Sequence, residues 1–231
     1  MDIPEFKLQS REDVINFQAH LTAYLKKSIG WESPYIDLLV AYDKLIPHER
    51  QGALLFSGLM DLKINFTLVV LDNFHSGAAW NELCSATVKE EKSVLDDFPF
   101  FYGRMEVHRH NANFVFRYRA IWDKIMGILV LLHSEEEYKR FSQAKSKKKF
   151  FKKLAPKMKF LPPDYAEVLL AELVKFDDAF RTREIHGFGI LRKWSFVMGS
   201  FHETPLIDLK NHWNWLLHHL ITLEKIIASI S

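Results

Sequence analysis

An arginine and a histidine five positions apart, Arg181 and His186, are the residues whose types and spacing best suit catalysis. A histidine can exchange a proton near neutral pH, and an arginine can hold a phosphate through a planar fork of donors. Together they could bind a phosphodiester and move a proton during its cleavage. Thr182 and Arg183 lie between them and are candidate substrate-binding residues. Arg183 is three positions before His186 and would share its face of a helix.

A strongly basic segment precedes this pair in the chain. Residues 139–159 contain ten Lys or Arg and no Asp or Glu, which leaves 21 of the 31 basic residues against 29 acidic ones elsewhere. The net charge of +2 therefore conceals a basic segment on an acidic body. Such a segment is either a solvated surface or a site for phosphates, in nucleic acid or at a membrane, or for an acidic protein. The candidate ligands of a phosphate backbone are Lys147, Lys148, Lys149, Lys152 and Lys153.

The spacing Arg181-x4-His186 resembles the R-x(4–6)-H motif of the HEPN families, which are all-helical and often dimeric. In active members the motif residues of two protomers meet in a cleft and act on the ribose 2′-OH and the scissile phosphate. The resemblance implies an RNA partner, a homodimer and endoribonuclease chemistry without a metal. Thr182 departs from the pattern, because active members usually carry Asn, Asp or His there. A second match, Arg104-x5-His110, has no polar residue after its arginine.

A wider resemblance is to uncharacterised all-α bacterial proteins with a long helix of YRxxWDKxxxLL type. It rests on residues 118–124, YRAIWDK, and on residues 191–194, LRKW, which follow the R-x4-H-G segment. These stretches imply the helical fold and no particular activity.

Other common sites find no support in the sequence. The single cysteine, Cys84, excludes an intrachain disulfide and a cysteine-based zinc site. Glu106, His108 and His110 alternate, which on a helix directs them to different sides, and there is no HExxH pattern. GxGxxG, Walker A and GxSxG patterns are also missing. We therefore expect neither a metal nor a cofactor.

Helices must position these residues, because apolar residues recur at spacings of three and four while Gly and Pro number only 9 and 8. The longest pattern covers residues 102–133, with Tyr118, Trp122, Ile125 and Leu129 on its apolar face. Other helices are expected at residues 10–27, 34–47, 48–74, 77–95, 135–141, 162–186 and 206–229. The sequence thus predicts an all-α fold, a single domain over residues 1–231 with seven to nine helices around one long central helix. A division near residues 139–162 is the alternative.

Two functional hypotheses follow. The first is a HEPN-like RNA-binding protein that acts as a metal-independent endoribonuclease and a homodimer, with Arg181 and His186 as the catalytic pair. The second is a non-enzymatic helical module that binds an acidic protein partner. The polar start, MDIPEFKLQSRED, is unlike a secretory or mitochondrial targeting segment. Uninterrupted apolar runs are shorter than the ~18 residues of a membrane span. We therefore expect a cytoplasmic protein without a membrane span.

Overall fold

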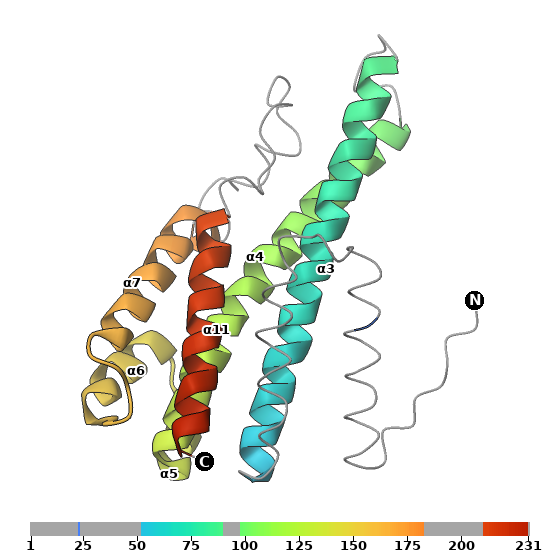
Figure 1. Cartoon of the computed structure of the whole chain (residues 1–231). Helices are drawn as coiled ribbons and strands as arrows, with labels where there is room; N and C mark the ends of the chain where they lie inside the picture. The colour runs from blue at the N-terminus through green and yellow to red at the C-terminus, as the bar shows by residue number, and fades with distance from the viewer. Residues whose placement is uncertain (1–22, 24–51, 90–97, 183–209, 231) are drawn as a thin grey trace.

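The computed structural model describes residues 23, 52–89, 98–182 and 210–230, and these ranges are helical and contain no β-strand (Figure 1). The all-α prediction is confirmed for them. They contain six α-helices: α3 (Ala53–Lys89), α4 (Phe98–His133), α5 (Glu135–Gln143), α6 (Lys147–Leu154), α7 (Tyr165–Phe176) and α11 (Lys210–Ile230). A 3-10 turn, η2 (Ala155–Lys157), follows α6, and a π-helical turn, η3 (Asp177–Arg181), follows α7. The count is lower than the seven to nine expected for the whole chain. The helix expected over residues 34–47 lies outside the described ranges, and that over residues 10–27 does so except for residue 23.

The two longest helices, α3 and α4, run antiparallel and form a hairpin that extends through most of the molecule in Figure 1. α3 buries the apolar stripe expected from its sequence: Leu55, Leu59, Leu62, Phe66, Val69 and Val70. The expected division into helices at residues 48–74 and 77–95 is wrong, because α3 continues without a break from Ala53 to Lys89. A glycine such as Gly77 inside a helix costs only about 1 kcal/mol relative to alanine, which packing against α4 can offset.

The helix around which the other described elements pack is α4. It contacts α3, α5, α6, α7, η3 and α11. Tyr118, Trp122, Ile125 and Leu129 on its apolar face are completely buried. The Tyr118 hydroxyl donates a 2.5 Å hydrogen bond to the backbone carbonyl of His212, which joins α4 to α11. The long helix expected over residues 102–133 and the burial of its apolar face are therefore confirmed.

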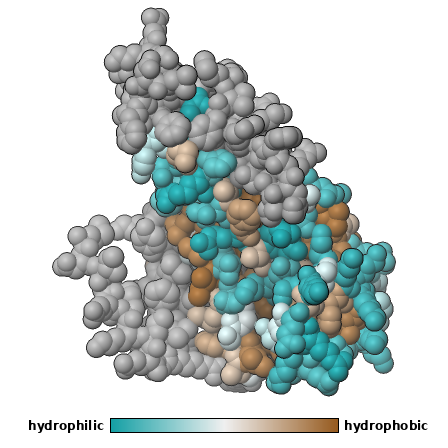
Figure 2. Space-filling view, turned by 180° about the vertical axis from the view of Figure 1, so that it is seen from behind, coloured by the Kyte–Doolittle hydropathy of each residue, from teal (hydrophilic) through white to brown (hydrophobic). Residues whose placement is uncertain are grey.

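The basic segment contains a capped helix, α6, that is anchored to the core. Ser134 caps α5 and Ser146 caps α6, and each hydroxyl accepts a hydrogen bond from the backbone N–H three residues later. Phe151 and Leu154 of α6 are buried, so an apolar anchor fixes the lysines of this helix to the body of the protein. Hydrophilic residues gather at the lower right of Figure 2, the side on which α5, α6 and α7 lie.

The helix expected over residues 162–186 begins at Tyr165, after the two prolines, and becomes the π-helical turn η3 at Asp177. Asp164 immediately precedes α7 with a left-handed φ of 59°, a conformation that Asp tolerates better than most residues. With this start, α7 packs against α6, and η3 contacts α4.

One stretch of the described residues, Ala53–Asn73 in α3, is long and apolar enough to cross a membrane, with a mean hydropathy of 1.7. Length and composition alone identify it, and the core helix of a soluble bundle has the same properties. In the structure 44% of this stretch is buried, and Asp61 within it pairs with Lys124 of α4. The absence of a membrane span therefore stays a prediction.

Candidate functional site

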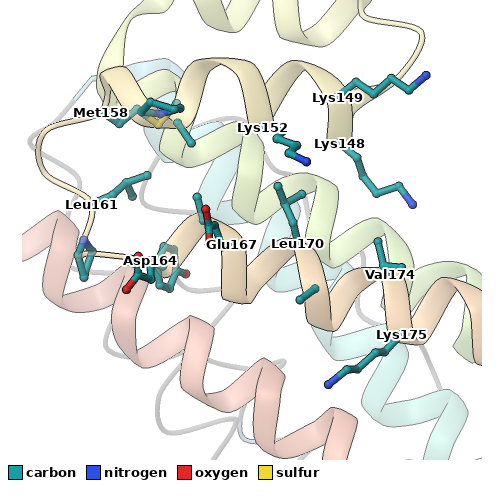
Figure 3. Close-up of a pocket in the computed structure, with 16 residues that line it drawn as sticks. Lys148, Lys149, Lys152, Met158, Leu161, Asp164, Glu167, Leu170, Val174 and Lys175 are labelled. Carbon is teal, nitrogen blue, oxygen red and sulfur yellow. The ribbon is translucent and has the colours of Figure 1, made fainter.

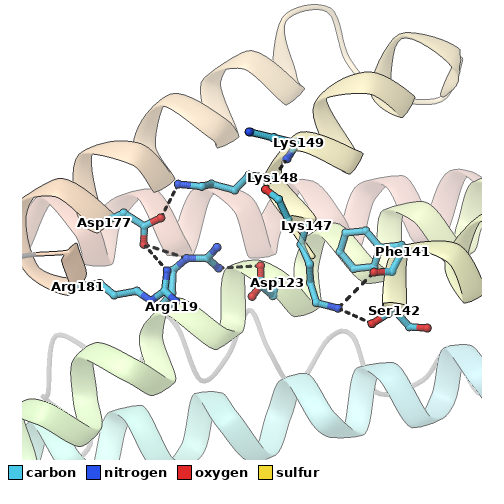
Figure 4. A network of polar contacts seen from close by, with 10 residues as sticks. Arg119, Asp123, Phe141, Ser142, Lys147, Lys148, Lys149, Asp177 and Arg181 are labelled. Carbon is cyan, nitrogen blue, oxygen red and sulfur yellow. Dashed lines mark hydrogen bonds and ion pairs between the residues drawn. The ribbon is translucent and has the colours of Figure 1, made fainter. Parts of the chain in front are cut away.

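The centre of the candidate site is the carboxylate of Asp177, whose side chain is only 4% exposed. Arg119 of α4 donates a 3.0 Å hydrogen bond from Nε to Oδ1, and Lys148 of α6 donates a 2.7 Å bond from Nζ to Oδ2. Arg181 Nη1 lies 3.9 Å from Oδ1 (Figure 4). Cations from three segments that are distant in the sequence therefore meet at one buried acid.

The local sequence explains the position of both Asp177 and Arg181. Asp177 comes four residues after the buried Leu173 and three before the buried Phe180, so it lies on the inward stripe of its helix. Asp177 and Arg181 are the first and last residues of η3, in which the N–H of Thr182 bonds to the Asp177 carbonyl. Single π-helical turns are found frequently at functional sites. This one places a half-exposed arginine beside a buried carboxylate.

The cluster retains positive charge. Arg119 forms a second ion pair, 2.8 Å from Nη1 to Oδ1 of Asp123, so three cationic groups face two carboxylates. Arg119 is buried, and its two carboxylate partners compensate its charge, since an unpaired buried charge is strongly destabilising. The side chains of Lys148 and Arg181 are 34% and 42% exposed, and their remaining N–H groups can donate to a second anion at the surface. The arrangement is therefore suited to holding a phosphate.

The five predicted lysines have different surroundings. Lys147 donates from Nζ to the carbonyls of Phe141 and Ser142 at the end of α5, and its ammonium lies 4.7 Å from the centre of the Phe141 ring. Lys148 is bound to Asp177, as described above. The other three are exposed and form no ion pair with any residue that the structure describes: Lys149, Lys152 and Lys153.

The predicted catalytic pair is described only in part. Arg181 lies in the Asp177 cluster and Thr182 is exposed beside it, whereas Arg183 and His186 lie outside the described residues. The other match to the motif has a different environment. Arg104 is buried, and His110 Nδ1 lies 3.2 Å from an oxygen of Asp72 on α3.

Sequence reasoning missed Asp177. The signal for it was an acidic residue on the inward stripe of a helix, where a buried carboxylate needs cationic partners. Asp123, whose side chain is 31% exposed, pairs with the buried Arg119. Tyr118 and Trp122 are fully buried, in keeping with their predicted place in the core.

A second polar cluster lies between α7 and α11. The ring of His219 is completely buried, with Nδ1 3.1 Å from the Tyr165 hydroxyl and Nε2 2.5 Å from a carboxyl oxygen of Glu172. With a neutral imidazole, the Tyr165 hydroxyl donates to Nδ1 and the Nε2 proton is donated to Glu172, which satisfies each group. The indole of Trp122 packs edge-on against the same ring, with centroids 5.0 Å apart. We assign this cluster a structural role.

Burial perturbs the histidine and the carboxylate of this cluster. It lowers the pKa of His219 to about 3, with a further contribution from His218, and raises the pKa of Glu172 to about 6, against the opposing effect of Lys175. The stability that His219 contributes is present above its ordinary pKa of 6.5 and is lost as the pH falls toward 3. The stability that Glu172 contributes is present below its ordinary pKa of 4.5 and is lost as the pH rises through about 6. Between about pH 6 and pH 4.5, a falling pH lowers the stability contributed by His219 and restores that contributed by Glu172. Below pH 4.5 only the His219 contribution still changes.

We expect the His219 contribution to the free energy of unfolding to fall by about 2 kcal/mol between pH 4.5 and pH 3. His219→Gln removes this titration and should flatten the acid side of the stability profile. His218→Gln removes only the smaller cause of the lowered His219 pKa and leaves the burial of His219, so that side should stay steep. Urea unfolding at a series of pH values measures the effect, and identical profiles for His219→Gln and wild type would contradict it.

Among the described residues, no group of three or more His, Cys, Asp and Glu side chains is arranged to hold a metal ion. In comparisons with known proteins, no protein-family model, no curated protein and no solved structure matches the chain. The functional interpretation therefore depends on the residues and their geometry.

Proposed function

We propose that this chain is a HEPN-like RNA-binding protein of the cytoplasm, a single helical domain that acts as a homodimer and cleaves RNA without a metal. The observation that supports this best is the contact of Lys148, from the basic segment, and Arg181, from the R-x4-H motif, with the same Asp177 carboxylate. Two sequence features that separately suggested RNA are therefore neighbours in space. A phosphate backbone bound by the basic segment would pass beside the motif arginine.

The proposed chemistry needs only a proton carrier and a cation. His186 takes the proton of a ribose 2′-OH as that oxygen attacks the phosphorus, and the bond from phosphorus to the 5′ oxygen breaks. The leaving oxygen takes up a proton from the second imidazole of the dimer. Arg181 stabilises the negative charge that develops on the non-bridging phosphate oxygens. The products are a 2′,3′-cyclic phosphate and a 5′-hydroxyl.

Helical geometry is the reason for proposing a homodimer. Residues five apart on an ideal α-helix are separated by about 140° around the axis and about 7.5 Å along it. Arg181 and His186 of one straight helix would therefore not share a face. A bent helix end or a second protomer must bring them together, and we propose the second protomer, as in the families that the motif resembles.

The test of this function is RNA binding by variants of the exposed lysines. Lys147 and Lys148 have contacts within the protein, so the informative change is Lys149, Lys152 and Lys153 together to Gln. We expect weaker binding of a fluorescein-labelled single-stranded RNA, measured by anisotropy. The slope of log affinity against log salt should decrease by up to about 2, at ~0.7 for each lost phosphate contact.

A matched control removes the same charge from exposed cations outside α6, with Lys139 and Arg140 at the start of the basic segment and Lys225 of α11 changed to Gln. Lys139 and Arg140 already pair with glutamates of α5. This control should retain the wild-type slope. Equal losses in both triple variants would mean that net charge alone matters. A wild-type protein without salt-dependent affinity for RNA at low ionic strength would reject RNA binding.

The second candidate is a non-enzymatic helical module that binds an acidic partner. It is favoured by the fact that Asp177 already neutralises part of the charge of Lys148 and Arg181, as in a purely structural network. RNA binding separates the two candidates, because a partner-binding module needs no affinity for single-stranded RNA.

A further inference from the structure

We propose that the groove between α6 and α7 is a docking site for an acidic amphipathic helix of a partner protein. The groove has a volume of about 1080 Å³ and is lined by one side of α6, the following turns and one side of α7 (Figure 3). This inference gives the acidic partner of the second candidate function a binding site, rests on that candidate and does not depend on RNA cleavage.

The floor of the groove is aliphatic. Its apolar lining includes Met158, Leu161, Leu170 and Val174, and Val174 is 42% exposed although it faces this hollow. An apolar groove beside a helix is a common site for the apolar face of a second helix, whose side chains enter at spacings of three and four residues. Burial of this floor would supply the affinity.

Charge is distributed unequally along the groove. Lys148, Lys149 and Lys175 lie toward one end in Figure 3, while Asp164 and Glu167 lie toward the other. Lys175 also lies over the ring of Trp215, 5.4 Å from its centre. A partner helix with acidic residues at one end and a basic residue at the other would match this pattern, which would fix its direction in the groove.

The lining favours a helix over single-stranded RNA as the occupant. Proteins that bind single strands without sequence preference stack the bases on open aromatic rings, but the aromatic residue that lines this groove, Tyr165, is only 5% exposed. Asp164 and Glu167 would also repel a phosphate backbone that followed the groove to its end. The length of α7, 12 residues or about 18 Å, corresponds to about three turns of a partner helix.

The chain offers two matched pairs of positions for a test. Val174 and Val168 lie on α7 with exposures of 42% and 43%, but only Val174 lines the groove. Lys152 and Lys153 are adjacent and exposed on α6, and only Lys152 lines it. Each pair compares identical side chains on the same helix.

The probe is a fluorescein-labelled helical peptide of about four turns, with leucines at spacings of three and four, glutamates at one end and a lysine at the other. A scrambled peptide of the same composition is the control. We expect the full-length protein to bind the amphipathic peptide at least tenfold more tightly than the scrambled one. Val174→Asp and Lys152→Glu should each weaken binding by about tenfold or more, and Val168→Asp and Lys153→Glu by about twofold or less.

Three results would overturn the proposal. The first is equal affinity for the amphipathic and scrambled peptides. The second is equal losses within each matched pair, which would indicate a non-specific effect of charge. The third is binding that depends on Lys152, is unaffected by Val174→Asp and is displaced by single-stranded RNA. That result would make the groove part of a nucleic-acid site.

Discussion

Replacing Trp122 with alanine is expected to lower the free energy of unfolding by about 3–5 kcal/mol, the usual cost of removing a large buried aromatic side chain. The indole has no exposed surface, and it packs against Tyr118 within α4 and against His219 of α11. Its loss would leave a cavity at the junction of the long helix with α11. This loss is a large share of the stability of a typical domain, so we expect partial unfolding of the variant at 37 °C.

Phe116→Ala provides the control for this substitution. Phe116 is an aromatic residue on the same helix but is 45% exposed, so its removal should cost much less than that of Trp122. Urea unfolding followed by circular dichroism compares the two variants. A Trp122→Ala protein as stable as the Phe116→Ala protein would show that α4 is not the centre of the core.

Arg181→Ala and His186→Ala are each expected to abolish RNA cleavage while leaving the helical circular dichroism signal unchanged. Arg181 would lose its charge-stabilising role, and His186 would lose the proton transfer, which alone typically contributes 10²–10⁴-fold. Arg181 is half-exposed and lies 3.9 Å from Asp177, which also pairs with Arg119 and Lys148, so its truncation should leave that carboxylate partnered.

Matched controls for these variants are Arg109→Ala and His218→Ala. Both residues are exposed and lie outside the Asp177 cluster. Neither change should affect cleavage. Arg104 is a poorer control because it is buried, and its replacement would affect folding. Cleavage that survives His186→Ala would reject this site even if the protein is a nuclease.

The sequence predicted most of the described fold because helical periodicity is a local signal. The stripe from Tyr118 to Leu129 identified both the long helix and its buried face. The division of α3 was predicted wrongly because it depended on a local helix breaker, Gly77, whereas the actual continuity is decided by tertiary packing against α4. Local propensity cannot supply that information.

The candidate site was less predictable because its contacts are distant in the sequence. Asp177 is 58 residues from Arg119 and 29 from Lys148, so no spacing rule connects them. The basic segment and the arginine motif could each be recognised by composition or spacing. Their common contact with one buried carboxylate required the packing of α6 and η3 against α4.

The most direct test of the proposed function is incubation of the purified, full-length protein with a panel of labelled RNAs in the presence of EDTA. We predict cleavage, because arginine and histidine chemistry needs no metal. The upstream fragment should end in a 2′,3′-cyclic phosphate, and the downstream fragment should begin with a 5′-hydroxyl. These termini can be identified by mass spectrometry and by sensitivity to a cyclic phosphodiesterase. Products ending in a 5′-phosphate, cleavage abolished by EDTA, or no cleavage of any RNA by a dimeric preparation would contradict it.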